Sequence, residues 1–225
     1  METYIEYQKQ VLDCTLWLSD HGFFGALRGT GGNVSVRIPG QDAFAITPSS
    51  IPYRDLAPGD ICIVDFDLQQ IRGDYGPSME AGMHLKVYQH RPDVNAVVHT
   101  HQPEASVFSL LNRPIPALFD EVVLSLGPVV EIIPYALSGS PELAENVAAA
   151  VGNGGHGYLI QNHGILCLGA TLEKAWLNAE LLEKTAQTYS RALATGMAVS
   201  TLPEDIVGLL AAIRKEARKK AVGKK

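Results

Sequence analysis

The chain has 225 residues, of which 46% are hydrophobic and 19% are charged, and its formal net charge is −6. This size suits one large domain with ample material for a core, and the negative charge argues against non-specific binding to nucleic acid, which needs a basic face. The three cysteines lie far apart without a CxxC pair, no uncharged apolar run approaches the roughly 18 residues of a membrane span, and the N-terminus lacks a signal-peptide layout, so we expect a cytoplasmic protein without membrane or nucleic-acid partners.

The N-terminal part of the chain begins with a helix and continues with strands. Residues 3–21 place apolar side chains at roughly helical spacing, and Gly22 is expected to end that helix. A glycine-rich stretch follows, with glycines at positions 25, 29, 31 and 32. Alternating and β-branched residues then predict strands, whereas residues 69–78 are rich in turn residues. The strands expected here span residues 33–38, 42–46 and 60–67.

The rest of the chain alternates between strands and helices. A helix over residues 78–91 ends at Arg-Pro-Asp, and a second helix has Ser140 as its N-cap, Pro141 as its first residue and Gly152 after it. Thr171 is expected to cap a long helix on its own. The other helices expected are 103–111, 171–195 and about 203–221, and the other strands are 94–101, 129–135 and two stretches within 156–169.

The order of these elements indicates the fold class. Several strands follow one another without an intervening helix, which disfavours a doubly wound parallel sheet. We therefore expect one α/β domain over residues 1–225, with a central mixed or antiparallel sheet flanked by helices. Residues 214–225 hold seven lysines and arginines, and we interpret them as a solvated, basic C-terminal tail.

Two histidines stand one residue apart at the end of an apolar run, "AVVHTH". Residues i and i+2 of a strand face the same side, so His99 and His101 project together. Neutral imidazoles are good zinc ligands, although an isolated H-x-H is also found in ordinary cores. His163 follows another apolar run, and Glu80 opens a helix from which its carboxylate could point back. The candidates for a third ligand are His163, His84, His90 and the carboxylates.

Several turns offer groups that bind anions. Gly32 and Asn33 end the glycine-rich turn, whose backbone N–H groups can form an anion nest. Ser49 and Ser50 follow a strand, and Ser78 precedes a helix N-terminus, which attracts anions. Taken singly, each of these is equally well read as an ordinary turn residue. For Ser49 and Ser50 alone the ordinary-turn reading is preferred. A phosphate site formed by the whole set would be built from neutral groups, in agreement with the acidic chain.

Four blocks of the sequence, in this order and spacing, resemble the class II aldolase/adducin family. They are "GTGGNVSVR" (29–37), "ITPSSIPYRDL" (46–56), "PSMEAGMHLKVYQHRPDVNAVVHTH" (77–101) and "QNHGILCLGATLEKAW" (161–176). The resemblance runs from about residue 4 to about residue 195. It implies a three-layer fold and a phosphate pocket at Gly32, Asn33, Ser49, Ser50 and Ser78.

The resemblance also implies a metal site. In the family a zinc ion is held by three histidines with a nearby glutamate, and the matching positions are His99, His101, His163 and Glu80. Cobalt or manganese could replace zinc at such a site. Adducin-like members keep the fold and lose these ligands, so their presence favours an enzyme over a scaffold.

The family reaction explains these residues. Aldol cleavage of a ketose phosphate leaves an enediolate, whose charge a divalent ion stabilises as a Lewis acid. The resemblance implies that Glu80 ligates the resting ion, is displaced by substrate and then acts as a base. The alternative is that Glu80 is only a first-turn carboxylate, which is favourable near a helix N-terminus.

Two departures from the family pattern bear on the substrate. Met79 in "PSME" stands where the family aldolases usually have a serine, so one hydroxyl donor to phosphate is lost. Asp120 aligns with a tyrosine that donates a proton on the aldehyde side, and Glu121 is the other candidate for this second acid or base. Both carboxylates are equally well read as surface groups on a loop.

Together these features predict a zinc-dependent aldolase that cleaves a ketose 1-phosphate to dihydroxyacetone phosphate and an aldehyde. The substrate would be similar to L-fuculose 1-phosphate or to a deoxy- or methylthio-ribulose 1-phosphate. The alternatives are a decarboxylase or 4-epimerase of a related sugar phosphate, and an adducin-like scaffold without catalysis. The resemblance further implies a homotetramer with active sites at subunit interfaces, where Asp120 or Glu121 could reach a neighbour's substrate.

Overall fold

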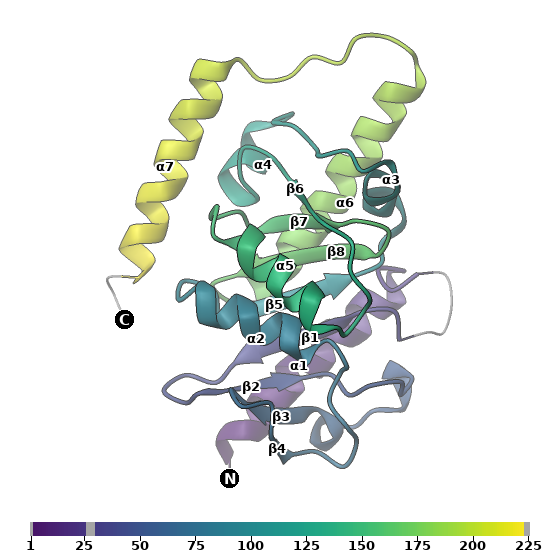
Figure 1. Cartoon of the computed structure of the whole chain (residues 1–225), viewed down its shortest axis with the longest axis vertical. Helices are drawn as coiled ribbons and strands as arrows, with labels where there is room; N and C mark the ends of the chain where they lie inside the picture. Colours follow the sequence, from purple (N-terminus) through teal and green to yellow (C-terminus); the bar gives the residue numbers. More distant parts are fainter. Residues whose placement is uncertain (1, 26–29, 223–225) are drawn as a thin grey trace.

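The computed structural model describes residues 2–25 and 30–222; Gly29 of the glycine-rich stretch and the last three residues of the basic segment lie outside the described residues. An eight-stranded sheet forms the centre of the molecule, in the order β4-β3-β2-β1-β5-β8-β7-β6 (Figure 1). Only β6 and β7 pair in parallel among the described strands, so the prediction of a mixed sheet is confirmed. The strands are β1 (Asn33–Arg37), β2 (Ala43–Ile46), β3 (Cys62–Asp65), β4 (Gln70–Arg72), β5 (Ala96–Thr100), β6 (Glu131–Ile133), β7 (Gly157–Ile160) and β8 (Gly164–Gly169).

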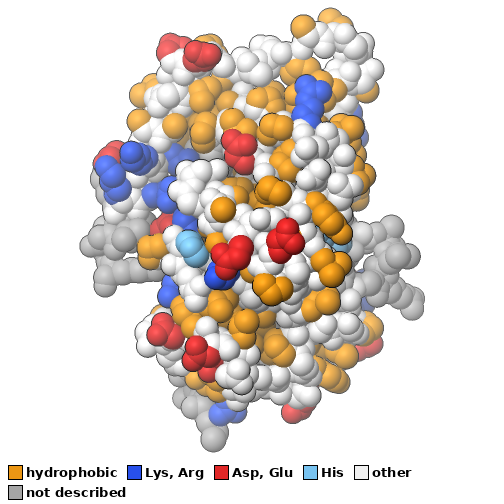
Figure 2. All heavy atoms as spheres, viewed as in Figure 1, with side chains coloured by type: hydrophobic (Ala, Val, Ile, Leu, Met, Phe, Trp, Pro, Cys, Tyr) orange, Lys and Arg blue, Asp and Glu red, His pale blue; other side chains and the backbone are white. Residues whose placement is uncertain are grey.

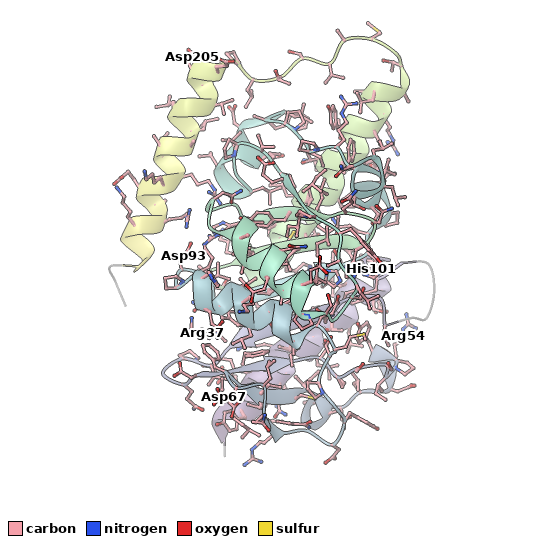
Figure 3. The ribbon with its side chains drawn as sticks, in the orientation of Figure 1. Arg37, Arg54, Asp67, Asp93, His101 and Asp205 are labelled. Atoms are coloured by element: carbon pink, nitrogen blue, oxygen red, sulfur yellow. The ribbon has the colours of Figure 1, made fainter. Side chains whose placement is uncertain are left out.

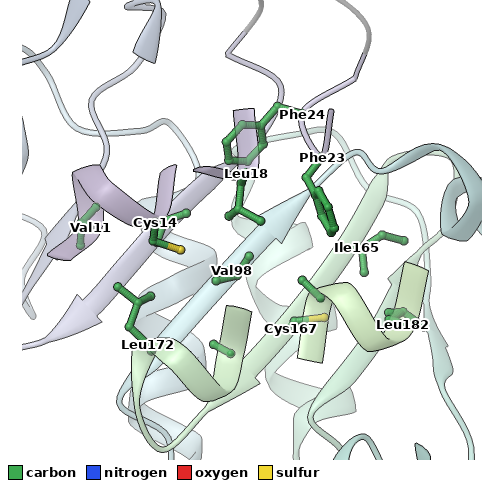
Figure 4. Packing of buried hydrophobic residues seen from close by; sticks show 14 of the residues in the cluster. Val11, Cys14, Leu18, Phe23, Phe24, Val98, Ile165, Cys167, Leu172 and Leu182 are labelled. Atoms are coloured by element: carbon green, nitrogen blue, oxygen red, sulfur yellow. The ribbon is translucent and has the colours of Figure 1, made fainter. Parts of the chain in front are cut away.

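Helices cover both faces of the sheet and its β6 end. The helices are α1 (Glu2–Asp20), α2 (Ala81–His90), α3 (Pro103–Leu111), α4 (Asp120–Ser125), α5 (Pro141–Val151), α6 (Leu172–Ala194) and α7 (Glu204–Val222). Helices α1, α3 and α6 pack on one face through a large apolar cluster (Figure 4), and α2 and α5 pack on the other. The three-layer arrangement therefore follows from strands that are apolar on both faces.

Alternation along β5 decides where the paired histidines point. Val98 belongs to the cluster under α1 and α6, whereas Val97 belongs to the cluster under α2. Since side chains alternate across a strand, His99 shares the face of Val97. This places the histidine on the side of the sheet where α2 begins.

The helix caps form as predicted. The Ser140 hydroxyl accepts a hydrogen bond from the Leu143 N–H, and Pro141 is the first residue of α5. The Thr171 hydroxyl accepts from the Lys174 N–H at the start of α6. These caps satisfy backbone donors that would otherwise lack a partner within the helix.

Three expectations are corrected. Residues 69–78 contain the short edge strand β4, and Asp120 begins a helix rather than lying on a loop. The basic segment is helical as far as it is described, because α7 continues to Val222, and it is only partly solvated. Arg214 is buried and donates to the Leu126 carbonyl, and Arg218 pairs with Asp93. In Figure 2 the basic side chains gather at the left of the face, where Figure 1 places α7.

None of the helices in the described part of the chain combines the length and apolar character that crossing a bilayer requires.

Candidate metal centre

Strand pairing brings three histidines from two segments together. His99 and His101 stand at the end of β5, and His163 lies in the turn that leads into β8. Because β5 and β8 are antiparallel neighbours, the end of β5 lies beside the start of β8. One ring nitrogen from each histidine lies within 4.8 Å of the others. The chain thus places three imidazoles around one point.

Gly164 is required for this approach. A Cβ atom at position 164 would lie 2.5 Å from the carbonyl oxygen of Thr100 and 2.6 Å from Cδ2 of His101. Such distances are far inside van der Waals contact, so any larger residue would force the turn away from β5. The glycine that follows His163 in the sequence therefore has a packing role beside the histidines.

Glu80 brings a carboxylate to the histidine cluster from the N-terminus of α2, the helix that packs on this face of the sheet. It is the N-cap residue of α2, but its side chain makes no capping hydrogen bond. Its Oε2 lies 3.2 Å from Nε2 of His99, and its Oε1 lies 3.3 Å from Nε2 of His163. The interpretation of Glu80 as only a first-turn carboxylate does not account for this orientation.

The donor set of this cluster fits a divalent cation. Nδ1 of His99 donates to the carbonyl oxygen of Ile165 at 2.7 Å, which leaves the Nε2 lone pair directed at the cluster. Nε2 of His101 lies 3.2 Å from Nε2 of His99, so two imidazole nitrogens face each other. The Glu80 Oε1 atom is buried without a hydrogen-bond partner among the described residues. Three imidazoles with a carboxylate are ligands that zinc prefers.

The local electrostatics keep His101, His163 and Glu80 in the protonation states that bind metal. Burial, followed by the charge of His99, lowers the pKa of His101 to about 3 and of His163 to about 4. Burial raises the pKa of Glu80, but His99, His163 and the Asn33 amide lower it by more, so the net shift is downward. Neutral imidazoles beside a carboxylate are the forms that coordinate cations at neutral pH.

A small cavity opens directly above the cluster. Its volume is about 160 Å³, and all five residues expected to bind phosphate are among those that line it. The Ser78 hydroxyl accepts a hydrogen bond from the Glu80 N–H at 3.3 Å, which leaves its own hydrogen free to donate. The lining residues are Thr30, Gly32, Asn33, Pro48, Ser49, Ser50, Ser78, Met79, Glu80, His101, Ser138 and His163.

Comparison with known proteins assigns the chain to a family. Residues 9–190 match the profile described as "Class II Aldolase and Adducin N-terminal domain". This chain is a member of the class II aldolase/adducin family. It is 38% identical over 202 residues to an L-fuculose phosphate aldolase of Escherichia coli O6:H1, an alignment that covers 90% of this chain and 91% of that one.

Two further relatives of this class II aldolase/adducin protein bear on its fold and reaction. A Rhodospirillum rubrum protein described as a 5-methylthioribulose-1-phosphate/5-deoxyribulose-1-phosphate aldolase is 40% identical over 169 residues, or 75% of each chain. A solved structure of an L-fuculose 1-phosphate aldolase superposes with a TM-score of 0.86 at 32% identity, covering 93% of this chain and 96% of that one. The three-layer α/β fold expected from the sequence is that of the family.

Two predicted catalytic carboxylates lie outside the cavity. Asp120 and Glu121 are the exposed first residues of α4, and neither lines the cavity described above. Glu121 pairs with Lys184 at 3.2 Å on the surface. Within one chain of this class II aldolase/adducin protein, these groups are therefore not brought to the histidines.

Two histidines considered as third ligands are excluded by their contacts. His84 is fully buried and hydrogen-bonded to Asn33 and Ser35, and His90 is exposed with Nδ1 beside the Lys86 carbonyl. His163 takes the third place in the cluster instead.

Ser138 is a cavity residue that the sequence did not reveal. Its hydroxyl lies 3.3 Å from Nε2 of His163, at the wall of the cavity. The surrounding "LSGSPE" carries only turn and capping signals, so nothing local pointed to the histidine.

Proposed function

We propose that this protein is a metal-dependent aldolase that cleaves a ketose 1-phosphate into dihydroxyacetone phosphate and an aldehyde. The observation that carries the proposal is the convergence of Glu80 with His99, His101 and His163 at the floor of a cavity rimmed by hydroxyl groups. The aldolase activity of relatives aligned over 75% to 90% of this chain supports it. An adducin-like scaffold would have no use for this donor set.

The three histidines and Glu80 would hold a zinc ion, for which cobalt or manganese could substitute. When bound, the ion supplies a Lewis acid for the carbonyl and hydroxyl oxygens of the sugar. Glu80 is the base that moves a proton at the carbon next to the carbonyl, since its carboxylate is kept anionic and lies at the cavity floor.

The phosphate group is bound by neutral donors on the other side of the cavity. Ser49, Ser50 and Ser78 offer hydroxyl groups, and Gly32 lies at the end of the glycine-rich turn. The side-chain amide of Asn33 is occupied by Glu80 and His84, so we assign Asn33 a backbone role in this pocket. Neutral donors suit a chain with a net charge of −6.

A homotetramer with active sites at subunit interfaces would bring Asp120 or Glu121 to a neighbour's cavity. Both residues are exposed at the start of α4, so a second subunit has access to them. One of the two would then exchange a proton with the aldehyde oxygen of the product.

The cytoplasm is the proposed location, since the three cysteines are buried free thiols in the folded chain.

The test is a coupled assay for dihydroxyacetone phosphate with the zinc-loaded protein and a panel of ketose 1-phosphates, including L-fuculose, 5-deoxyribulose and 5-methylthioribulose 1-phosphates. Release of dihydroxyacetone phosphate from at least one of them, abolished by His163→Ala, is the expected result. Carbon dioxide release from a sugar-acid phosphate, or epimerisation without cleavage, would replace the aldolase assignment by one of those reactions. Absence of both turnover and stoichiometric metal would indicate a scaffold.

A further inference from the structure

A chain of hydrogen bonds runs from Glu80 into the interior on the α2 side of the sheet. The Asn33 amide nitrogen donates to Oε2 of Glu80 at 2.8 Å, and Oδ1 of Asn33 contacts Nε2 of His84. Nδ1 of His84 lies 2.6 Å from the Ser35 hydroxyl, which lies 2.6 Å from the Tyr88 hydroxyl. None of the four residues that continue this chain from Glu80 is more than 4% exposed.

The direction of every bond in this relay follows from the first one. A carboxylate only accepts hydrogen bonds, so Asn33 must turn its NH₂ group toward Glu80 and its oxygen toward His84. That oxygen in turn requires a proton on Nε2 of His84. The neutral ring then has a lone pair at Nδ1, which accepts from the Ser35 hydroxyl, and Ser35 accepts from Tyr88.

Burial keeps His84 in this neutral form. The ring is completely inaccessible to solvent, and burial disfavours a charged imidazole. A reversed Asn33 amide would set its oxygen against the carboxylate, and the opposite His84 tautomer would face an acceptor with a lone pair. Both faults would leave buried polar groups without hydrogen-bond partners, which is strongly unfavourable.

We propose that His84 is a positioning residue that acts through Asn33 to hold the Glu80 carboxylate in one orientation as a hydrogen-bond acceptor. The Asn33 amide donates to Oε2 of Glu80, whereas Oε1 has no hydrogen-bond partner among the described residues and lies beside His163. Its effect on turnover rests on the proposed function, whereas the tautomer of His84 belongs to the folded chain itself.

The tautomer is measured by long-range ¹H–¹⁵N spectra of zinc-loaded protein labelled at its histidines, with the His84 signals assigned from a His84→Gln sample. The expected result near neutral pH is a protonated Nε2 and an unprotonated Nδ1. Protonation at Nδ1, or on both nitrogens, would overturn the proposal regardless of any activity.

The functional role is tested with His84→Gln and His84→Leu. Glutamine can offer its amide N–H near the position of Nε2, whereas leucine fills the space without a donor. We expect His84→Leu to lower kcat and zinc affinity about tenfold, as for other residues that orient a metal ligand, with little change in KM. We expect His84→Gln to recover most of both. His90→Gln on the exposed end of α2 is the matched control.

A second variant covers the case in which His84→Leu does not fold. Ser35→Ala removes the donor to Nδ1 and leaves the packing nearly unchanged, so it should lower zinc affinity in the same direction. Equal losses in the glutamine and leucine variants, or a loss confined to KM, would assign His84 a merely structural role. If no substrate is cleaved by the parent, the spectra and zinc affinities still decide the matter.

Discussion

Replacing Asp93 by asparagine removes a carboxylate charge that is surrounded by two arginines and a histidine. Its oxygens lie 2.8 Å from Nε of Arg91 and 2.9 Å from Nε of Arg218, and 3.7 Å from Nε2 of His156. Figure 3 shows Asp93 between the end of α2 and α7. The carboxylate therefore joins the C-terminal helix to the body of the domain, and asparagine keeps its shape without its charge.

The size of the effect follows from burial. The side chains of Arg91 and Asp93 are 3% and 8% exposed, and removing one partner of a buried pair costs about 3–5 kcal/mol. Arg218 is more exposed, at 29%, and it also bonds the Gly154 carbonyl, which limits the loss. We expect Asp93→Asn to lower the free energy of unfolding by about 3 kcal/mol at neutral pH.

The pH dependence has a defined sign. Burial raises the pKa of Asp93, but hydrogen bonds and charge from Arg91, His156 and Arg218 lower it far below its ordinary value. A lowered folded-state pKa adds stability above the unfolded-state pKa of about 3.9, and that stability is lost as the pH falls below it. The advantage of the parent over Asp93→Asn is thus constant near neutrality and shrinks below about pH 4.

Urea unfolding of both proteins across this pH range measures the difference, and Asp67→Asn at an exposed position is the matched control. Faster amide hydrogen exchange in α7 of Asp93→Asn would accompany the loss. Equal stability at neutral pH, or a difference that persists undiminished in acid, would refute the reasoning.

Three further predictions concern the metal centre and the phosphate pocket. Gly164→Ala pushes the turn that holds His163 away from β5. It should lower the free energy of unfolding by about 1–3 kcal/mol, measured by urea unfolding, and weaken zinc binding, measured by chelator competition. His163→Ala should reduce bound zinc below one per chain in elemental analysis, because it removes a ligand. Met79→Ser restores a hydroxyl beside Ser78 and should lower KM for a ketose 1-phosphate with kcat unchanged, as measured by steady-state kinetics; a higher KM would show that Met79 itself binds substrate.

Local patterns predicted most of the helices and strands because each pattern reflects one local cause. Ser140 and Thr171 cap their helices through bonds that span three residues, and the apolar alternation of β5 needs no distant partner. The short strand β4 was missed because its three residues are exposed, and the single isoleucine between Gln70 and Arg72 is too weak a signal on its own. Helix α4 was missed because a six-residue helix held by tertiary packing leaves little periodicity to detect.

By itself, the sequence determined the family and the fold class, and it predicted that Glu80, His99, His101 and His163 form one cluster, because their types and spacing lie in four ordered blocks. Only the tertiary structure decided which groups meet. The pairing of β5 with β8 selects His163 over His84, since register, not sequence distance, sets which side chains converge. Likewise, Arg218 pairs with Asp93, which lies 125 positions earlier in the chain. No local pattern predicts this pair, because only the packing of α7 against the domain brings the two residues together.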